Sequence, residues 1–441
     1  MHLKFALPAV LLALAAAASA GVFPYRFETH TLANGLKVIL VPMPAEGLVA
    51  YYSIVRTGSR DEVEPGRSGF AHFFEHMMFR GTERFPAGEY DRLITAMGAN
   101  ANAYTTDDYT CYHLSFAAKD LPQVVELEAD RFQNLAYTEQ DFQTEAGAVY
   151  GEYRKGRTNP FEVLEEALRD TAFEVHTYKH TTIGFEADIA AMPGMLDYSR
   201  SFFQRFYRPD NVIILVAGEI DPVEATLALI RQHYGHWESG YIPPQVPVEP
   251  EQTTPRRVEV PYQGRTLPLL AVMWKAPAFD PADLDVAAGL ALGELLAGPT
   301  SPLYRELVLN RRTVQRLMGQ FRAQRDPGLW GVIAQVAEDE HLPEVEKAIA
   351  DAVAELERRP PAAEHLEAVK AHLRYSFLMS LETPDQLAGE LAPWIALTGG
   401  VEGVDTFFAT LERVTPAEVQ RLAAARLRPE RSTVAVLKGV E

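Results

Sequence analysis

Residues 69–82 read GFAHFFEHMMFRGT, a largely apolar stretch that holds two histidines and one glutamate. His72 and His76 are four residues apart, so a helix places both imidazoles on one face, about one turn from each other. Glu75 lies beside them, three residues after His72. Buried His and Glu side chains need a partner, and a metal ion bound by both imidazoles would supply one. The stretch therefore predicts a metal-binding helix.

A hydrolytic zinc site needs a third protein ligand and an open position for water. A helical stretch predicted at residues 121–154 carries Glu145 and Glu152, which are seven residues apart and so lie on one face. From the residues alone, either carboxylate can be the third ligand. The spacing H-x-x-acid-H arises by chance in roughly four of a hundred sequences of this composition, so it does not decide the function alone.

Strands are predicted at residues 36–41, 49–56 and 110–116, where β-branched and aromatic residues gather. Mixed with the helical spacing around them, they favour an α+β fold class. Residues 208–216 (RPDNVIILV) are similar to residues 428–436 (RPERSTVAV), each being a turn followed by a strand pattern. We therefore predict two homologous domains.

Proline and glutamate crowd residues 242–255, which is typical of an extended linker. The chain has 441 residues, enough for two domains of ordinary size. We predict an N-terminal catalytic domain at 21–241, a linker at 242–256 and a C-terminal domain without metal at 257–441.

Residues 1–20 are typical of a secretory signal peptide, with an apolar run followed by Ala18-Ser19-Ala20 as a cleavage site. We expect an exported protein, located in a bacterial periplasm. No later stretch approaches the roughly 20 apolar residues of a membrane span, so no membrane association is expected after cleavage. The net charge of −19 argues against a nucleic-acid partner.

Two further features carry no function in this interpretation. Cys111, the only cysteine, lies in a strand pattern and is expected to be a small buried side chain rather than a nucleophile. His176 and His180 are also four residues apart, but no acidic residue stands three positions after His176 and their neighbours suggest a loop. We predict no second metal site there.

A family resemblance extends well past the five motif residues. Residues 69–82 resemble the signature of the pitrilysin, insulinase and mitochondrial-processing-peptidase family of zinc peptidases. Residues 98–106 (GANANAYTT) resemble the next block of that family, and Glu152 stands 76 positions after His76, where the family has its third ligand. The resemblance implies that each domain is an antiparallel-rich sheet packed with helices.

The resemblance also implies a role for each site residue. One Zn²⁺ per chain would be bound by His72, His76 and Glu152, with Glu75 as general base for a zinc-activated water and Glu145 orienting the site. Peptide substrate would be held as an added β-strand at Asn102 and Ala103. The implied activity is that of a zinc metalloendopeptidase acting on peptides or unfolded segments.

The chain departs from the family in its second half. Active members carry an Arg and, seven residues later, a Tyr that bind substrate; the matching block at 301–310 puts Val308 and Gln315 at those positions. No tyrosine after the linker has an arginine seven residues before it. The chain thus resembles the metal-binding subunit of a bacterial two-subunit member. We predict a heterodimer with a homologous subunit that binds no metal. A homodimer is the less favoured alternative.

Two alternatives remain open. The chain could be a non-catalytic relative that serves as an assembly or binding subunit, although its complete metal motif argues against this. It could also be a metalloenzyme that hydrolyses bonds other than peptide bonds, because zinc and a general base serve several hydrolyses.

Overall fold

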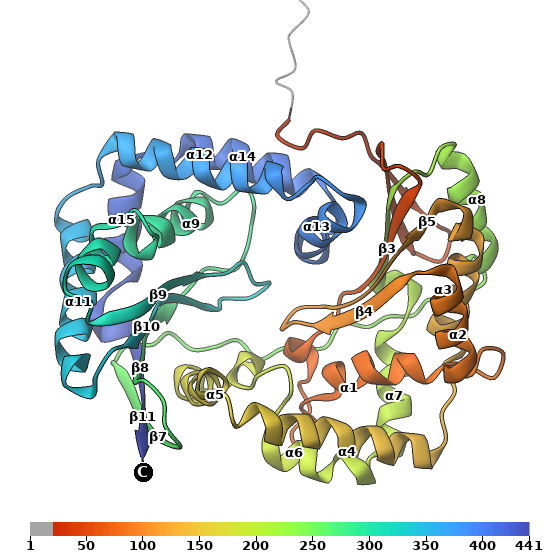
Figure 1. Ribbon diagram of the computed structural model, residues 1–441, viewed down its shortest axis with the longest axis horizontal. Coiled ribbons are helices and arrows are strands. Elements are labelled where there is room, and N and C mark those ends of the chain that lie inside the picture. The colour runs from red at the N-terminus through yellow and green to blue at the C-terminus, as the bar shows by residue number, and fades with distance from the viewer. Residues whose placement is uncertain (1–20, 441) are drawn as a thin grey trace, which may run out of the picture.

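The computed structural model describes residues 21–440 and consists of two halves, each built on one sheet covered by helices (Figure 1). The predicted signal peptide at 1–20 lies outside the described residues. The strands are β1 (Glu28–Thr31), β2 (Lys37–Pro42), β3 (Leu48–Val55), β4 (Asn100–Thr105), β5 (Thr110–Ala117), β6 (Val212–Gly218), β7 (Arg256–Gln263), β8 (Leu269–Lys275), β9 (Val314–Phe321), β10 (Leu329–Val336) and β11 (Ser432–Val440).

Helices connect and cover these strands. They are α1 (Phe70–Met77), α2 (Ala87–Met97), α3 (Leu121–Asn134), α4 (Glu139–Gly156), α5 (Pro160–Ala172), α6 (Glu186–Ala191), α7 (Leu196–Phe206), α8 (Val223–Tyr234), α9 (Leu284–Ala297), α10 (Pro302–Tyr304) with the π-helical turn η7 (Arg305–Asn310), α11 (Leu342–Arg358), α12 (Ala363–Met379), α13 (Pro384–Thr398), α14 (Glu402–Arg413) and α15 (Pro416–Arg426). Among these described helices, none has both the length and the apolar character needed to cross a bilayer.

The two sheets share one topology. The first has the order β1-β2-β6-β3-β5-β4 and the second the order β7-β11-β8-β10-β9. Each contains one parallel pair, β2 with β6 and β7 with β11, and its other pairs are antiparallel. Without β1 the two orders correspond strand for strand. The prediction of an α+β fold with two homologous domains is confirmed.

The predicted strands fall on β2, β3 and β5, and the two similar segments fall on β6 and β11. The single helix predicted over 121–154 is wrong, because α3 ends at Asn134 and α4 begins at Glu139. Thr138 starts the second helix: its hydroxyl accepts from the Asp141 N–H, while the Asp141 carboxylate accepts from the Thr138 N–H. This reciprocal capping box stabilises a new helix start where the apolar pattern alone suggests continuity.

One helix from each half packs against the sheet of the other half. Helix α13, from the second half, lies against β3 and β6 of the first sheet, and α5, from the first half, lies against β7 and β11 (Figure 1). Helix α5 buries Val163, Leu164 and Leu168 in a shared cluster with Leu269 and Leu437. Burying one such side chain contributes roughly 1.5–3 kcal/mol. The two halves are therefore joined by an apolar interface and not only by the chain.

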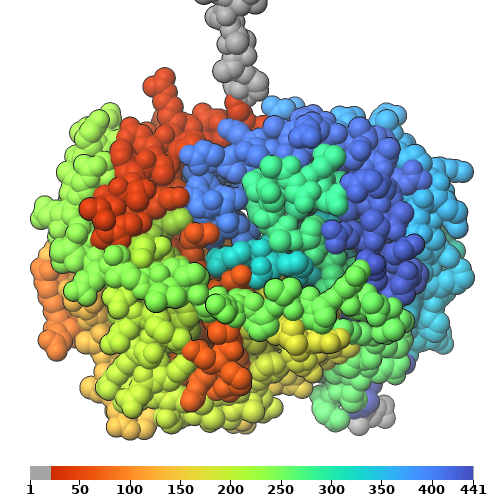
Figure 2. Space-filling view, turned by 180° about the vertical axis from the view of Figure 1, so that it is seen from behind, coloured from red at the N-terminus to blue at the C-terminus, as the bar shows by residue number. Residues whose placement is uncertain are grey.

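The segment between α8 and β7 has no regular structure and crosses the back of the molecule from one half to the other (Figure 2). It is docked on the protein surface. The Glu249 carboxylate accepts hydrogen bonds from the N–H groups of Glu174, Val175 and His176, and Lys275 Nζ lies 3.5 Å from it. These contacts fix the crossing segment against both halves.

Candidate metal centre

Gly69 is the N-cap of the metal-motif helix α1 and has a conformation that only glycine adopts easily. Its φ is +91°, and a Cβ there would lie 2.5 Å from the carbonyl oxygen of Ile183. The Glu62 carboxylate accepts from the N–H groups of Gly69 (2.7 Å) and Ala71 (2.6 Å). These N–H groups have no partner within the helix, and a carboxylate at this end also complements the helix dipole. Glu62 therefore fixes where α1 starts.

One face of α1 anchors it in the core of the first domain. Phe70, Phe73, Phe74 and Met77 are fully buried and follow the i, i+3, i+4, i+7 spacing of an apolar helix face. Phe74 stacks on Phe202, with ring centroids 5.3 Å apart. His72, Glu75 and His76 occupy the rest of the helix surface, so their positions depend on the packing of this aromatic core.

Helix α4 brings Glu152 to both histidines. Glu152 Oε2 lies 3.7 Å from Nε2 of His72 and 3.4 Å from Nε2 of His76. Two ligands bound tetrahedrally at about 2.1 Å from one zinc ion are about 3.4 Å apart, so these separations fit a shared ion. Over residues 21–440, no other group of three His, Cys, Asp or Glu residues comes together in this way. Two imidazoles and one carboxylate form a donor set typical of catalytic zinc.

Glu145, the other candidate ligand, contacts the opposite edge of His76. Its Oε1 lies 2.8 Å from His76 Nδ1, and its Oε2 accepts from Arg80, with Nε 2.7 Å away. A carboxylate bound to Nδ1 leaves Nε2 of the imidazole free for a metal and holds the ring in place. The structure thus places Glu152, and not Glu145, beside both Nε2 atoms.

Excess negative charge makes this site favourable for a cation. Hydrogen bonds to Glu145 and Glu152 raise the pKa of His76 to about 10. The hydrogen bond between His76 and Glu152 also holds the pKa of Glu152 below its usual value. Burial lowers the pKa of His72. The carboxylates therefore attract positive charge to the imidazoles, and a divalent ion would neutralise them better than one proton.

Thr105, at the end of β4, forms a hydrogen bond with Glu75. Its Oγ1 donates to Glu75 Oε2 at 2.7 Å. The sequence interpretation missed both Thr105 and Arg80. A signal existed for each: Arg80 is four residues after His76, and Thr105 lies two residues after Ala103, on the same strand face.

Strand β4 carries Asn102 and Ala103 at the edge of the first sheet. Within the described chain it pairs only with β5, at the end of the strand order. Asn102 Oδ1 accepts from the Ala103 N–H at 2.9 Å, so this N–H points away from β5. By strand alternation, the main chain of Ala101 and Thr105 faces the same open edge. An extended peptide could pair there, as the family resemblance implies for Asn102 and Ala103.

A cavity of about 700 Å³ opens beside His72 and is lined by both halves of the chain. His72, Glu152 and Thr105 line it from the first half, and Arg322 from the segment between β9 and β10 lines it from the second. Cavities of this size are typical of ligand sites. Val308 lies in η7 and Gln315 on β9, and neither of these two described residues lines the cavity.

Three residues for which the sequence predicted no catalytic or metal-binding role make ordinary structural contacts: His176, His180 and Cys111. His176 Nε2 lies 3.0 Å from Asp326 Oδ2, and its Nδ1 accepts from the Tyr178 N–H. His180 is buried, with its Nδ1 next to the Thr181 carbonyl oxygen. Cys111 is buried in β5, and burial raises the pKa of its thiol, which disfavours the thiolate.

Replacing Glu145 by Gln tests the contact that orients His76. The amide keeps the size of the side chain but removes the negative charge that both His76 and Arg80 contact. Loss of a partner of this kind typically costs 10–100-fold in metal affinity, so we expect a Kd for zinc about 10–100 times higher. Competition with a chromophoric chelator measures it. Glu139→Gln, an exposed change on the same helix, is the control; equal affinity of both variants would contradict the role.

Comparison with known proteins bears on the family of this chain. The model for insulinase (peptidase family M16) matches residues 38–186, and the model for the peptidase M16 inactive domain matches residues 196–373. The zinc protease PqqE of Helicobacter pylori is 28% identical over 438 residues, covering 97% of this chain and 96% of the relative. The probable mitochondrial-processing peptidase subunit beta of Schizosaccharomyces pombe is 24% identical, with 94% and 92% covered.

A solved structure agrees with the sequence matches. The crystal structure of a protease from Helicobacter pylori superimposes with a TM-score of 0.87 at 28% identity, covering 94% of this chain and all of that one (100%). The two family models follow each other along the chain, and the predicted resemblance to the insulinase and processing-peptidase family is confirmed. The chain belongs to peptidase family M16.

Proposed function

We propose that this chain is an exported zinc metalloendopeptidase that cleaves peptides or unfolded segments, with Glu75 as the general base. One observation carries the proposal: Nε2 of His72, Nε2 of His76 and Oε2 of Glu152 lie within 4.8 Å of one another, in a site next to Glu75 and the open edge of β4. The relatives named zinc proteases support the same chemistry. Export to a bacterial periplasm is proposed from residues 1–20 alone.

The residues of this chain would divide the reaction among them. His72, His76 and Glu152 would hold the zinc, which when bound supplies a Lewis acid and lowers the pKa of water towards about 7. The Glu75 carboxylate, oriented by Thr105, would accept a proton from the attacking water and return it to the leaving amine. The edge of β4 would pair with the substrate main chain and so place the scissile bond.

The second half of the site is proposed to come from another subunit. Val308 and Gln315 stand where active relatives are expected to have Arg and Tyr, so this chain lacks two groups that would bind substrate and the developing oxyanion. We propose a heterodimer in which a homologous chain without metal supplies them. A homodimer is the less favoured assembly, because a second copy would bring neither group.

Mixing the two chains tests this division. The purified chain is expected to bind one zinc but to cleave an unstructured peptide slowly, and the homologous metal-free chain should raise kcat/KM by about a hundredfold or more. The reason is that one missing oxyanion donor alone costs about 10²–10³-fold in rate. Peptide cleavage followed by mass spectrometry measures it. Robust activity of the pure chain would overturn the partner requirement.

The same mixture separates the competing classes of function. Zinc binding without peptide cleavage in every mixture would favour a binding or assembly subunit. Cleavage of an ester or amide probe without peptide cleavage would favour a different hydrolase.

A further inference from the structure

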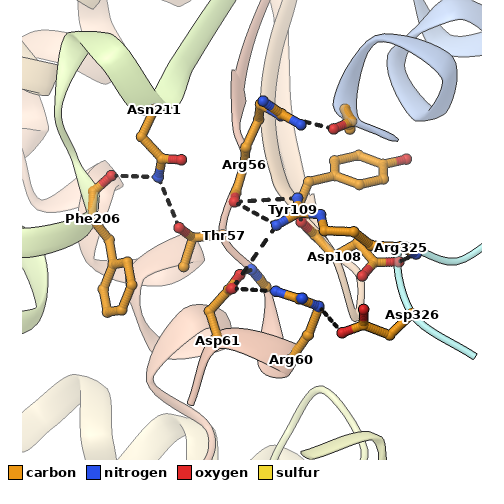
Figure 3. A network of polar contacts seen from close by, with 12 residues as sticks. Arg56, Thr57, Arg60, Asp61, Asp108, Tyr109, Phe206, Asn211, Arg325 and Asp326 are labelled. Carbon is orange, nitrogen blue, oxygen red and sulfur yellow. Dashed lines mark hydrogen bonds and ion pairs between the residues drawn. The ribbon is translucent and has the colours of Figure 1, made fainter. Parts of the chain in front are cut away.

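The segment that joins β9 to β10 in the second domain contacts the first domain through Arg325 and Asp326 (Figure 3). Its first residue, Arg322, lines the same cavity as His72. We call residues 322–328 the interdomain latch. Asp326 Oδ2 lies 2.6 Å from Arg60 Nε and 3.0 Å from His176 Nε2, and the Asp326 N–H donates to the Tyr178 hydroxyl at 3.2 Å. One latch carboxylate thus connects two separate segments of the first domain.

The neighbouring latch residues bind the turn between β4 and β5. Arg325 donates from Nη2 to the carbonyl oxygen of Asp108 at 2.8 Å and from its backbone N–H to the Asp108 carboxylate at 3.1 Å. Gln324 Nε2 donates to Asp107 Oδ2 at 2.8 Å. The guanidinium of Arg169, on α5, contacts the same Asp107 carboxylate. The second domain and α5 therefore hold the side chains of this turn, while the N–H groups of Ser59 and Arg60 in the first domain donate to its carbonyl oxygens.

This turn leads directly to the general base. Asp107 is two residues after Thr105, whose hydroxyl donates to Glu75, and the turn is closed by the Thr106 N–H donating to the Tyr109 carbonyl oxygen at 2.8 Å. The Thr105 side chain can reach Glu75 only while the end of β4 keeps its place. The metal ligands lack this dependence, because α1 and α4 are anchored in the core of the first domain.

The side chains of the latch contacts are also poorly exposed to solvent, which strengthens their hydrogen bonds. The side chains of Asp61 and Arg60 are 0% and 14% exposed, and Asp326 is 28% exposed. Burial opposes ionisation of Asp326, but the hydrogen bonds from His176 and Arg60 prevail and lower its pKa to about 2. Asp326 is therefore charged at neutral pH, and removing it would leave Arg60 in a poorly solvated place with Asp61 as its remaining partner.

We propose that the interdomain latch positions Glu75 through Thr105, so that Arg325 and Asp326 of the metal-free domain act as positioning residues for catalysis. The proposal rests on the zinc peptidase function proposed above. It assigns the second domain a role within the same chain: holding the β4–β5 turn keeps the Thr105 hydroxyl on the Glu75 carboxylate. The hydrogen bonds of Arg325 and Asp326 go to other residues than the metal ligands and β4.

The test compares Asp326→Asn, Thr105→Val and the double variant in whichever form of the enzyme is active, alone or with its partner. Because misplacing a reacting group by about 1 Å can cost up to about 10²-fold, we expect each single variant to lower kcat at least tenfold, with KM and zinc content nearly unchanged. The double variant should be no slower than Thr105→Val within about threefold, because both changes release the same carboxylate.

Hydrogen exchange gives a readout that does not depend on activity. In Asp326→Asn, amides of residues 103–110 should exchange faster, while those of α1 should not change. Asp351→Asn, the same chemical change on the exposed surface of α11, is the matched control and should leave both measurements unchanged. If Asp326→Asn fails to fold, Arg325→Met replaces it, since it removes the guanidinium donors of Arg325 and keeps the aliphatic stem.

The outcomes separate this proposal from the one on which it rests. If the wild-type protein cleaves no peptide, the peptidase function fails, whereas faster exchange at 103–110 would still show that the latch holds the turn. If the wild-type protein is active and Asp326→Asn retains its kcat, the latch proposal is overturned. Rate losses that multiply in the double variant would overturn it as well.

Discussion

Replacing Glu75 by Gln is expected to lower kcat by about a thousandfold while zinc stays bound. The amide oxygen can still accept the hydrogen bond from Thr105, but an amide cannot take up a proton from water. General bases typically contribute 10²–10⁴-fold, and no other described carboxylate is placed to replace Glu75, because Glu145 and Glu152 both contact the histidines. Cleavage of an unstructured peptide and zinc analysis of the same sample measure the two effects.

The matched control for this variant is Glu83→Gln, an exposed glutamate that follows α1 closely in the chain. It should keep both zinc and activity. A Glu75→Gln protein that retains more than about a tenth of the wild-type kcat would exclude Glu75 as the general base. Loss of zinc in that variant would instead make Glu75 part of the metal shell.

Replacing Glu152 by Ala is expected to remove most of the zinc affinity without unfolding the protein. Structural zinc sites with four ligands bind with about 10–16 kcal/mol, so one ligand accounts for roughly 2.5–4 kcal/mol, which corresponds to about a hundredfold to a thousandfold in Kd. The Glu152 side chain is 49% exposed and lies at the cavity, so little packing is lost. Chelator competition gives the Kd, and thermal unfolding of the metal-free proteins checks the fold.

The comparison with Glu145→Gln makes this experiment decisive. If Glu152 binds the metal and Glu145 only orients His76, the loss of affinity must be larger in Glu152→Ala than in Glu145→Gln. The reverse order would assign Glu145 as the third ligand. The sequence alone left this choice open, because both carboxylates lie on one face of α4.

Local patterns predicted much of the fold for a physical reason. Strand and helix periods are set by a few neighbouring residues, and so β2, β3, β5 and α1 fall where the apolar spacing indicates. The break between α3 and α4 was missed because the apolar pattern continues through it. A local signal was present, since Thr138 and Asp141 have the spacing of a capping box.

Sequence by itself determined which donor groups the candidate metal site offers: four-residue spacing on a helix places His72 and His76 on one face, whatever the rest of the chain does. Only the tertiary structure decided that Glu152 and not Glu145 meets both Nε2 atoms, that Thr105 reaches Glu75, and that residues 322–328 hold the turn after β4. These contacts join residues 30 to 217 positions apart. Their distances follow from how α4, β4 and the two domains pack, and packing of distant elements leaves no periodic pattern in the chain.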